Sequence, residues 1–126
     1  MARFIFEAQL VPDIVVSSTA NRAKSTAQLF VSNCDSLDCE VITTDEFYHA
    51  PAQVYLDFAA EFSDEVNTAM VVGHNPGMEN LVELLSGEYE RMPTAAIAHA
   101  VFDIDSWGDL KVEQCNVQSV WRPKEI

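Results

Sequence analysis

Short apolar runs alternate with helical patterns along most of this chain. Residues 13–18 (DIVVSS), 39–45 (CEVITTD) and 68–74 (TAMVVGH) are dense in β-branched or other apolar residues, which predicts three strands. Apolar residues recur at helical spacing in 19–33, 51–64 and 76–87, which predicts a helix after each strand. Parallel strands need such crossovers, so the alternation predicts an α/β fold: a mostly parallel sheet between helical layers.

The predicted helices also carry end signals. Pro51 and Pro76 stand near two helix starts, and Gly87 follows the end of the last helix. Thr19 is a candidate N-cap for the first of the three, and Asn33 a candidate stop. The residues expected on the buried faces are Ala20, Ala23, Ala27 and Phe30 in the first helix and Val54, Phe58 and Phe62 in the second.

The strand at 68–74 is continuously apolar, which is typical of an interior strand of a parallel sheet. Residues 95–104 and 110–121, separated by 105–109 (DSWGD), predict an antiparallel hairpin that closes the sheet. Residues 4–10 predict a further helix, which has no strand before it. No repeat or low-complexity segment divides the chain, so we expect one domain over 1–126.

The charge of the chain limits its partners. Seven Lys and Arg residues face 20 Asp and Glu residues, for a formal charge of −13, which disfavours nucleic acid and anionic membranes. No apolar run approaches the ~20 residues that span a bilayer, and no signal peptide is recognisable. Cys34, Cys39 and Cys115 lack C-x-x-C spacing, so we expect no zinc site or disulfide framework, and a cytoplasmic location.

Two predicted strand ends carry polar side chains suited to an anion. Ser17 and Ser18 end one strand and Arg22 follows in the first turn of the next helix, while His74 follows another strand. In open α/β sheets, ligands gather at the carboxyl ends of strands, where helix N-termini supply free N–H groups. Each residue also has a structural interpretation: a surface arginine, a histidine bonded to backbone, and serines that form a turn.

The same segments resemble a known family. "PDIVVSSTANRAKSTAQLF" is similar to the second motif of the histidine phosphatase superfamily, in its phosphohistidine phosphatase branch, and "VVGHNPGMENLVELLSG" is similar to its Gly-His-Asn-Pro segment. "DEFYHA", "MPTAAIAHAVFDIDSWGDL" and "RPKEI" resemble its connection, closing hairpin and tail. The resemblance implies a phosphoglycerate mutase-like α/β/α sandwich.

The resemblance also implies roles for particular residues. Arg22 matches the arginine that binds the phosphoryl group, and His74 matches the second active-site histidine, which contacts the same oxygens. Ser18 lies beside that pocket in the family. The implied substrate is a phosphohistidine protein or a small phosphate ester, hydrolysed through a phosphorylated histidine. No metal or organic cofactor is implied.

One family feature is missing from the sequence. Members begin with a strand that ends in Arg-His-Gly and carries the nucleophilic histidine. No Arg-His-Gly is present here, and none of His49, His74 and His99 follows an arginine. We therefore expect an N-terminally truncated domain that lacks its first strand, with impaired or absent turnover. The alternative is a non-catalytic relative that binds phosphate or phosphohistidine, or that forms homo-oligomers through the exposed sheet edge.

The remaining polar candidates are less specific. His49 is an ambiguous third candidate, and Asp45 or Glu46 could supply a proton donor, although solvated carboxylates are the simpler interpretation. His99, Trp107 and Trp121 are expected to be packing residues.

Overall fold

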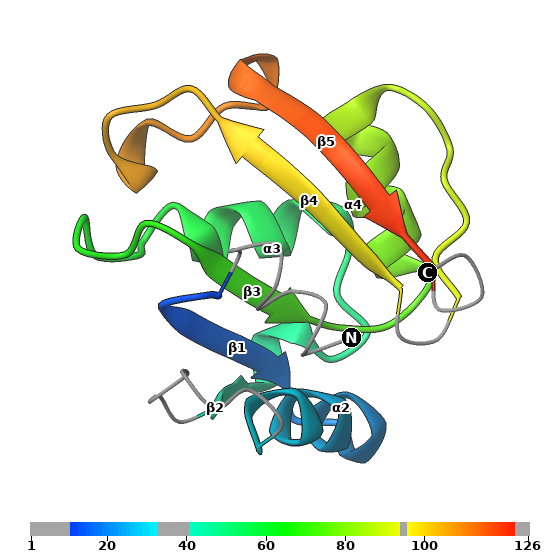
Figure 1. Cartoon of the computed structure of the whole chain (residues 1–126). Coiled ribbons are helices and arrows are strands. Elements are labelled where there is room, and N and C mark those ends of the chain that lie inside the picture. Colours follow the sequence, from blue (N-terminus) through cyan, green and yellow to red (C-terminus); the bar gives the residue numbers. More distant parts are fainter. Residues whose placement is uncertain (1–10, 33–40, 94–95, 123–126) are drawn as a thin grey trace. The chain divides into compact units, whose positions relative to one another are not determined.

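The computed structural model describes residues 11–32, 41–93 and 96–122 (Figure 1). They fall into two compact units, each made of two separate stretches of chain. The first unit joins the chain up to Tyr48 with Glu65–His74, and the second joins His49–Asp64 with the chain from Asn75 onward. Segments of the two units therefore alternate along the sequence.

The first unit contains a parallel sheet. Its strands are β1 (Ile14–Ser18), β2 (Val41–Thr44) and β3 (Ala69–Val72), in the order β2-β1-β3. Helix α2 (Asn21–Ser32) lies between β1 and β2 in the sequence, and a 3₁₀ turn, η1 (Asp45–Phe47), follows β2. The three strands predicted from their apolar content are thus confirmed, with β1 between the other two.

The core of this unit lies between β1 and α2. Val15 and Val16 are fully buried in the central strand. Ala23, Ala27 and Phe30 of α2 are buried, as their helical spacing predicted. Two alanines on this face let the helix approach the sheet closely, and Phe30 adds apolar area removed from water.

The strand that was predicted to be interior has a partner on one side only within the described residues. The continuously apolar run that forms β3 was expected inside the sheet, but within the described strands β3 pairs with β1 alone and is half-buried. Strand β1 holds the interior position, because it has a parallel partner on each side. Asp13 closes the start of β1 against β3: its carboxylate accepts hydrogen bonds from the backbone N–H groups of Asn67 and Thr68.

The second unit combines two helices with an antiparallel hairpin. Its elements are α3 (Ala52–Ala59), α4 (Gly77–Ser86), β4 (Ile97–Phe102) and β5 (Cys115–Trp121). The predicted hairpin is confirmed, with Ile97 opposite Trp121 and a register shift between His99 and Ala100. It forms a separate two-stranded sheet, and its connection contains two 3₁₀ turns, η2 (Trp107–Asp109) and η3 (Val112–Gln114).

Helix α3 differs from the prediction in length and in buried face. It ends at Ala59, and its buried residues are Tyr55 and Leu56, whereas the predicted Val54, Phe58 and Phe62 are half-buried. Phe62 lies beyond the helix end, so the helical spacing does not govern its direction. It instead packs edge-to-face between Phe58 and Trp107, with ring centroids 5.9 and 5.3 Å away.

Helix α4 begins and ends at its predicted signals. Pro76 is its N-cap residue, and Gly87 closes it with φ 82°, a left-handed conformation that glycine adopts without a Cβ penalty. Leu81 and Val82 are buried on this helix.

The described residues form a mixed α/β fold: a parallel sheet, an antiparallel strand pair and three helices. No helix among them is long and apolar enough to span a membrane. Several predictions lie outside the described residues: the helix at 4–10, the stop at Asn33, and the roles of Cys34 and Cys39. Cys115 is a half-buried free thiol, and burial raises its pKa.

Candidate oxyanion site at the strand ends

The carboxyl ends of β1 and β3 lie side by side in the first unit. Ser17 pairs in parallel register with Val72, so the chain after each strand leaves the same edge of the sheet. Ser18 is fully buried at the end of β1, and the half-buried His74 lies two residues past β3. The Ser18 hydroxyl oxygen is 3.3 Å from Nε2 of the His74 ring.

The Ser18 hydroxyl is held from a second direction. Its oxygen accepts a hydrogen bond of 3.2 Å from the backbone N–H of Ala20. If Nε2 of His74 is unprotonated, the serine donates its proton to the ring. If Nε2 carries a proton, the ring is the donor. Ser18 can therefore satisfy His74 in either state, which keeps a titratable ring next to a fixed hydroxyl.

Arg22 stands at the same end of β1. It is the second residue of α2, four positions after Ser18, and its side chain is exposed. Within the described part of the chain, its guanidinium has no ion-pair or hydrogen-bond partner. The free N–H groups and positive dipole of the first turn of α2 also favour an anion at this end.

A carboxylate occupies the neighbouring strand end. Thr44 pairs in register with Ser18, and Asp45 follows it at the same sheet edge. The Asp45 carboxylate accepts a hydrogen bond of 2.7 Å from the Thr19 hydroxyl. Asp45 was expected to be only solvated, and Thr19 was expected near the helix N-cap. The pairing of β1 with β2 brings them together, and spacing in the sequence gives no signal of it.

The other candidates have more ordinary surroundings. His99 of β4 stacks on Trp121 of β5 at 6.0 Å and 17° between ring planes, which confirms the packing role. Trp107 packs against Phe62, as noted above. His49 is exposed with φ 51°, an uncommon backbone conformation for a residue with a side chain. Among the described residues, no group of three His, Cys, Asp or Glu side chains could hold a metal ion.

Solved structures supply the comparison, because no family model and no curated protein matches the sequence. The chain is similar to a protein of Agrobacterium tumefaciens assigned as the phosphohistidine phosphatase SixA, with 27% identity and a TM-score of 0.77. The match covers 97% of this chain and 75% of that one.

Two further structures share this fold. A protein of Nakamurella multipartitia, also assigned as SixA, has 21% identity and a TM-score of 0.77, over 97% of this chain and 77% of its own. The protein histidine phosphatase SixA complexed with tungstate has 21% identity and a TM-score of 0.78, over 98% of this chain and 77% of its own. The chain is therefore similar, over nearly its whole length, to solved phosphohistidine phosphatases of the histidine phosphatase superfamily, and it shares their fold.

Proposed function

We propose that the strand-end site of this protein binds the phosphoryl group of a phosphohistidine protein or a small phosphate ester. Arg22 supplies a planar fork of donors, His74 supplies a ring N–H, and Ser18 holds the ring. The chemistry of this donor set suits a tetrahedral oxyanion. One of the similar structures contains tungstate, which has that shape.

One observation is the main support for the proposal: the Ser18 hydroxyl oxygen lies 3.3 Å from Nε2 of His74, at the carboxyl ends of two neighbouring parallel strands. It puts a titratable imidazole at the sheet edge where α2 begins and where Arg22 stands. The long-range repulsion of a phosphate by a chain of charge −13 is screened beyond about 8 Å in physiological salt. A local guanidinium and imidazole can therefore dominate binding.

We further propose that the 126-residue chain is a phosphatase of the phosphohistidine type with impaired or absent turnover. The covalent route needs a histidine that attacks phosphorus in line and is then dephosphorylated by water. Arg-His-Gly, which carries that residue in the family, does not occur in this sequence. Arg22 and His74 would stabilise the charge on the phosphoryl group during its transfer. Neither of them matches the histidine that serves as the nucleophile in the family.

The alternative function is a non-catalytic module that binds phosphate or phosphohistidine, or that assembles with copies of itself. The lack of Arg-His-Gly in the sequence favours it, because Arg22 and His74 can bind an anion but do not supply the covalent step. Light scattering tests assembly: a compact monomer at all concentrations would count against it.

The first experiment measures tungstate affinity by isothermal titration calorimetry at two salt concentrations. A charge-assisted hydrogen bond is worth about 1.5–3 kcal/mol, so Arg22→Ala should weaken binding by roughly 10- to 100-fold. His74→Ala should weaken it as well. Lys24→Ala is the matched control, because it removes one positive charge from an exposed position of the same helix and should change affinity only slightly.

The second experiment measures phosphate release from a phosphohistidine peptide and from p-nitrophenyl phosphate. Tungstate binding without turnover would support the binding module. Turnover abolished by His74→Ala would support an enzyme that uses this histidine directly. Equal tungstate affinity in wild type, Arg22→Ala and His74→Ala would refute the site.

A further inference from the structure

A carboxylate lies beside the candidate oxyanion site, at the end of the neighbouring strand. Asp45 follows Thr44, which pairs in register with Ser18. Neighbouring strands of a sheet lie about 4.8 Å apart. The Ser18 hydroxyl oxygen is in turn 3.3 Å from Nε2 of His74, and all four residues belong to the first unit. An anion bound by Ser18 and His74 would therefore lie near a negative charge on the β2 side.

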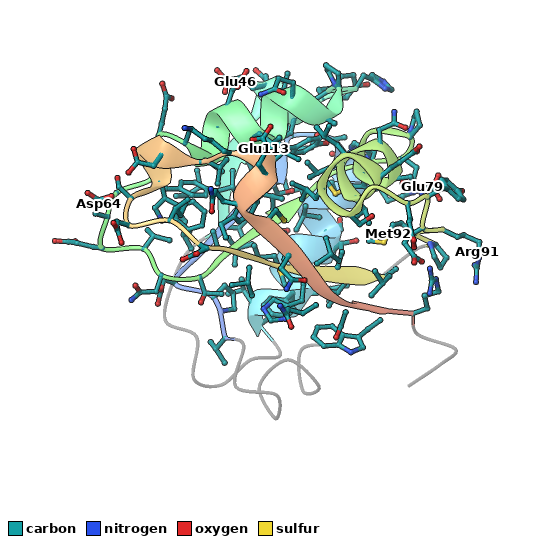
Figure 2. All side chains as sticks on the ribbon, turned by 90° about the horizontal axis from the view of Figure 1, so that it is seen from above. Glu46, Asp64, Glu79, Arg91, Met92 and Glu113 are labelled. Atoms are coloured by element: carbon teal, nitrogen blue, oxygen red, sulfur yellow. The ribbon has the colours of Figure 1, made fainter. Side chains whose placement is uncertain are left out.

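The backbone of Asp45 is held in place by the turn that it begins. Asp45 is the first residue of η1, and its carbonyl accepts the Tyr48 N–H at 3.0 Å. The Thr44 hydroxyl caps the turn by accepting the Glu46 N–H at 3.1 Å. Phe47 anchors the turn, because its side chain is fully buried. Glu46, by contrast, is exposed on the outside of the ribbon (Figure 2).

The side chain of Asp45 is directed by a hydrogen bond to the connection between β1 and α2. Thr19 directly follows Ser18, and its hydroxyl donates to Oδ1 of Asp45 at 2.7 Å. Hydrogen bonds to a charged acceptor are shorter and stronger than neutral ones. The bond therefore turns an exposed carboxylate toward the connection that leads to Arg22, instead of leaving it free in solvent.

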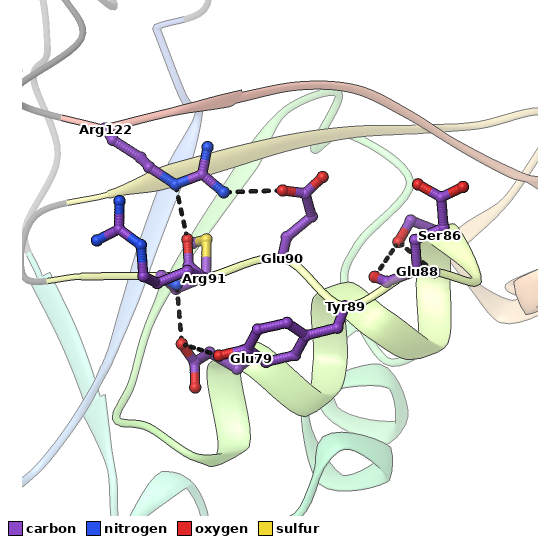
Figure 3. Close-up of polar contacts among 8 residues, drawn as sticks. Glu79, Ser86, Glu88, Tyr89, Glu90, Arg91 and Arg122 are labelled. Atoms are coloured by element: carbon purple, nitrogen blue, oxygen red, sulfur yellow. Dashed lines mark hydrogen bonds and ion pairs between the residues drawn. The ribbon is translucent and has the colours of Figure 1, made fainter.

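No ion pair within the described part of the chain neutralises the charge of Asp45. Two carboxylates of the second unit show the contrast (Figure 3). Glu90 pairs with Nη2 of Arg122 at 2.8 Å, and Glu79 accepts the backbone N–H of Met92 at 2.9 Å. Those two carboxylates connect separate segments of the chain. The Asp45 carboxylate instead keeps an unpaired negative charge at the sheet edge where the anion is proposed to bind.

We propose that Asp45 is a specificity-determining residue, which makes the oxyanion site discriminate against doubly charged ligands. The interaction energy of two charges is proportional to their product, so the carboxylate repels a doubly charged oxyanion twice as strongly as a singly charged one in the same position. An unpaired charge placed against the wrong ligand is one way in which sites achieve specificity.

The favoured ligands follow from this difference in repulsion. Relative to a site without Asp45, the preference shifts toward singly charged oxyanions and toward phosphoryl groups whose attached group offsets one charge. The inference rests on the proposed role of Arg22 and His74 in oxyanion binding.

The test compares two oxyanions of the same tetrahedral shape: tungstate, which is doubly charged, and perrhenate, which is singly charged. Their affinities are measured at one mildly alkaline pH by chemical-shift titration, which detects weak binding. Asp45→Asn removes the charge, and its amide oxygen can still accept the Thr19 hydroxyl. The substitution should strengthen perrhenate binding about threefold and tungstate binding about tenfold.

Glu46→Gln is the matched control for the loss of charge. It removes one negative charge from the next residue of the same turn, where the side chain is exposed. It should change both affinities less than about twofold, because solvent and salt screen an exposed charge. The effect of Asp45→Asn should shrink at about 1 M salt, where the Debye length falls to about 3 Å.

Substitutions of Thr19 test whether the carboxylate must be held at the site. Thr19→Val removes the hydroxyl and releases the carboxylate, so the ratio of tungstate to perrhenate affinity should rise part of the way toward its value in Asp45→Asn. Thr19→Ser keeps a hydroxyl and should keep the wild-type ratio. If Asp45→Asn does not fold, the comparison of Thr19→Val with Thr19→Ser decides.

The ratio of the two affinities separates this role from a merely structural one. If Asp45 only stabilised the turn, Asp45→Asn would lower the unfolding temperature and weaken both oxyanions by the same factor, which would overturn the inference. Equal ratios in Asp45→Asn and Glu46→Gln would also overturn it. In both cases wild type still binds tungstate through Arg22, so the proposed function would stand.

Failure of the proposed function gives a different result. If neither oxyanion binds to wild type or to any of these variants, the proposed function is refuted, and this inference with it. Tungstate binding that appears only in Asp45→Asn would support the inference, because the carboxylate alone would then exclude the doubly charged ligand.

Discussion

Gly77, the first residue of α4, provides a sharp test of how closely α4 packs against the chain at Ala50. An added Cβ there would lie 2.4 Å from the carbonyl oxygen of Ala50, a backbone atom, and 3.6 Å from a ring carbon of Tyr55. Helix propensity alone would make Gly77→Ala stabilising by up to about 1 kcal/mol. The contact must therefore overcome that gain for the substitution to destabilise the protein.

The structure sets the size of the effect. Real Cβ contacts essentially never fall below 3.0 Å, so α4 or the Ala50 backbone would have to move by at least roughly 0.6 Å. Such overpacking costs about 1–3 kcal/mol. Because the obstacle is backbone rather than a flexible side chain, we expect the upper part of that range. The net loss of unfolding free energy for Gly77→Ala should be about 1–2 kcal/mol.

Two other glycines serve as controls in urea unfolding followed by circular dichroism. At Gly108 an added Cβ would meet only the Ser106 hydroxyl, at 3.8 Å, so Gly108→Ala should be near neutral. At Gly87 no atom lies within 4 Å, but φ is +82°, so Gly87→Ala should cost about 1 kcal/mol through backbone strain alone. Equal unfolding midpoints for Gly77→Ala and Gly108→Ala would refute the reasoning.

Three further predictions concern the core, the thiol and a tyrosine. Phe47 is fully buried in η1, so Phe47→Ala should lower the unfolding free energy by about 3–5 kcal/mol in the same urea assay, and a loss below about 1 kcal/mol would contradict its burial. Burial raises the pKa of Cys115, so iodoacetamide at pH 8 should modify it more slowly in the folded protein than in urea, as read by peptide mass spectrometry. Since that folded pKa is raised, the stability contribution of the thiol is present below its ordinary pKa and is lost as pH rises through the folded value. The hydrogen bond to Glu79 raises the pKa of Tyr89, so Glu79→Gln should lower it in a spectrophotometric titration corrected with Tyr89→Phe, and an unchanged value would contradict the contact.

Local signals in the sequence predicted the elements well where the ends are chemically marked. Helix α4 begins after Pro76 and ends at Gly87 because fixed and left-handed backbone dihedrals belong to those residue types. Helix α3 lacks such a stop and ends at Ala59, three residues before Phe62, which packs against Trp107. The choice of β1 as the interior strand likewise depends on pairing, since both strands are similarly apolar.

In the candidate site, too, some contacts could be predicted from the sequence and others could not. The closeness of Ser18 and His74 follows from the rule that parallel strands end at one edge, and sequence sufficed to predict it. The Thr19–Asp45 bond could not be predicted, because it joins residues 26 positions apart whose meeting depends on strand register. The same holds in the second unit for the Glu79–Met92 bond, which joins residues 13 positions apart and depends on the path of the chain after α4. The convergence of Arg22 with His74 on one anion stays a prediction for the tungstate experiment.

The interleaving of the two units has a consequence for how the chain acquires its structure during synthesis. Residues 49–64 emerge from the ribosome before Glu65–His74, yet they belong to the unit whose other members come last. The first unit can be completed only after β3 has been synthesised. The α3 segment lies before β3 in the chain, and its partners within the second unit, α4 and the hairpin, are synthesised later. Neither unit can be expressed as one uninterrupted fragment, and a cut at any bond between His49 and His74 would separate partners within both.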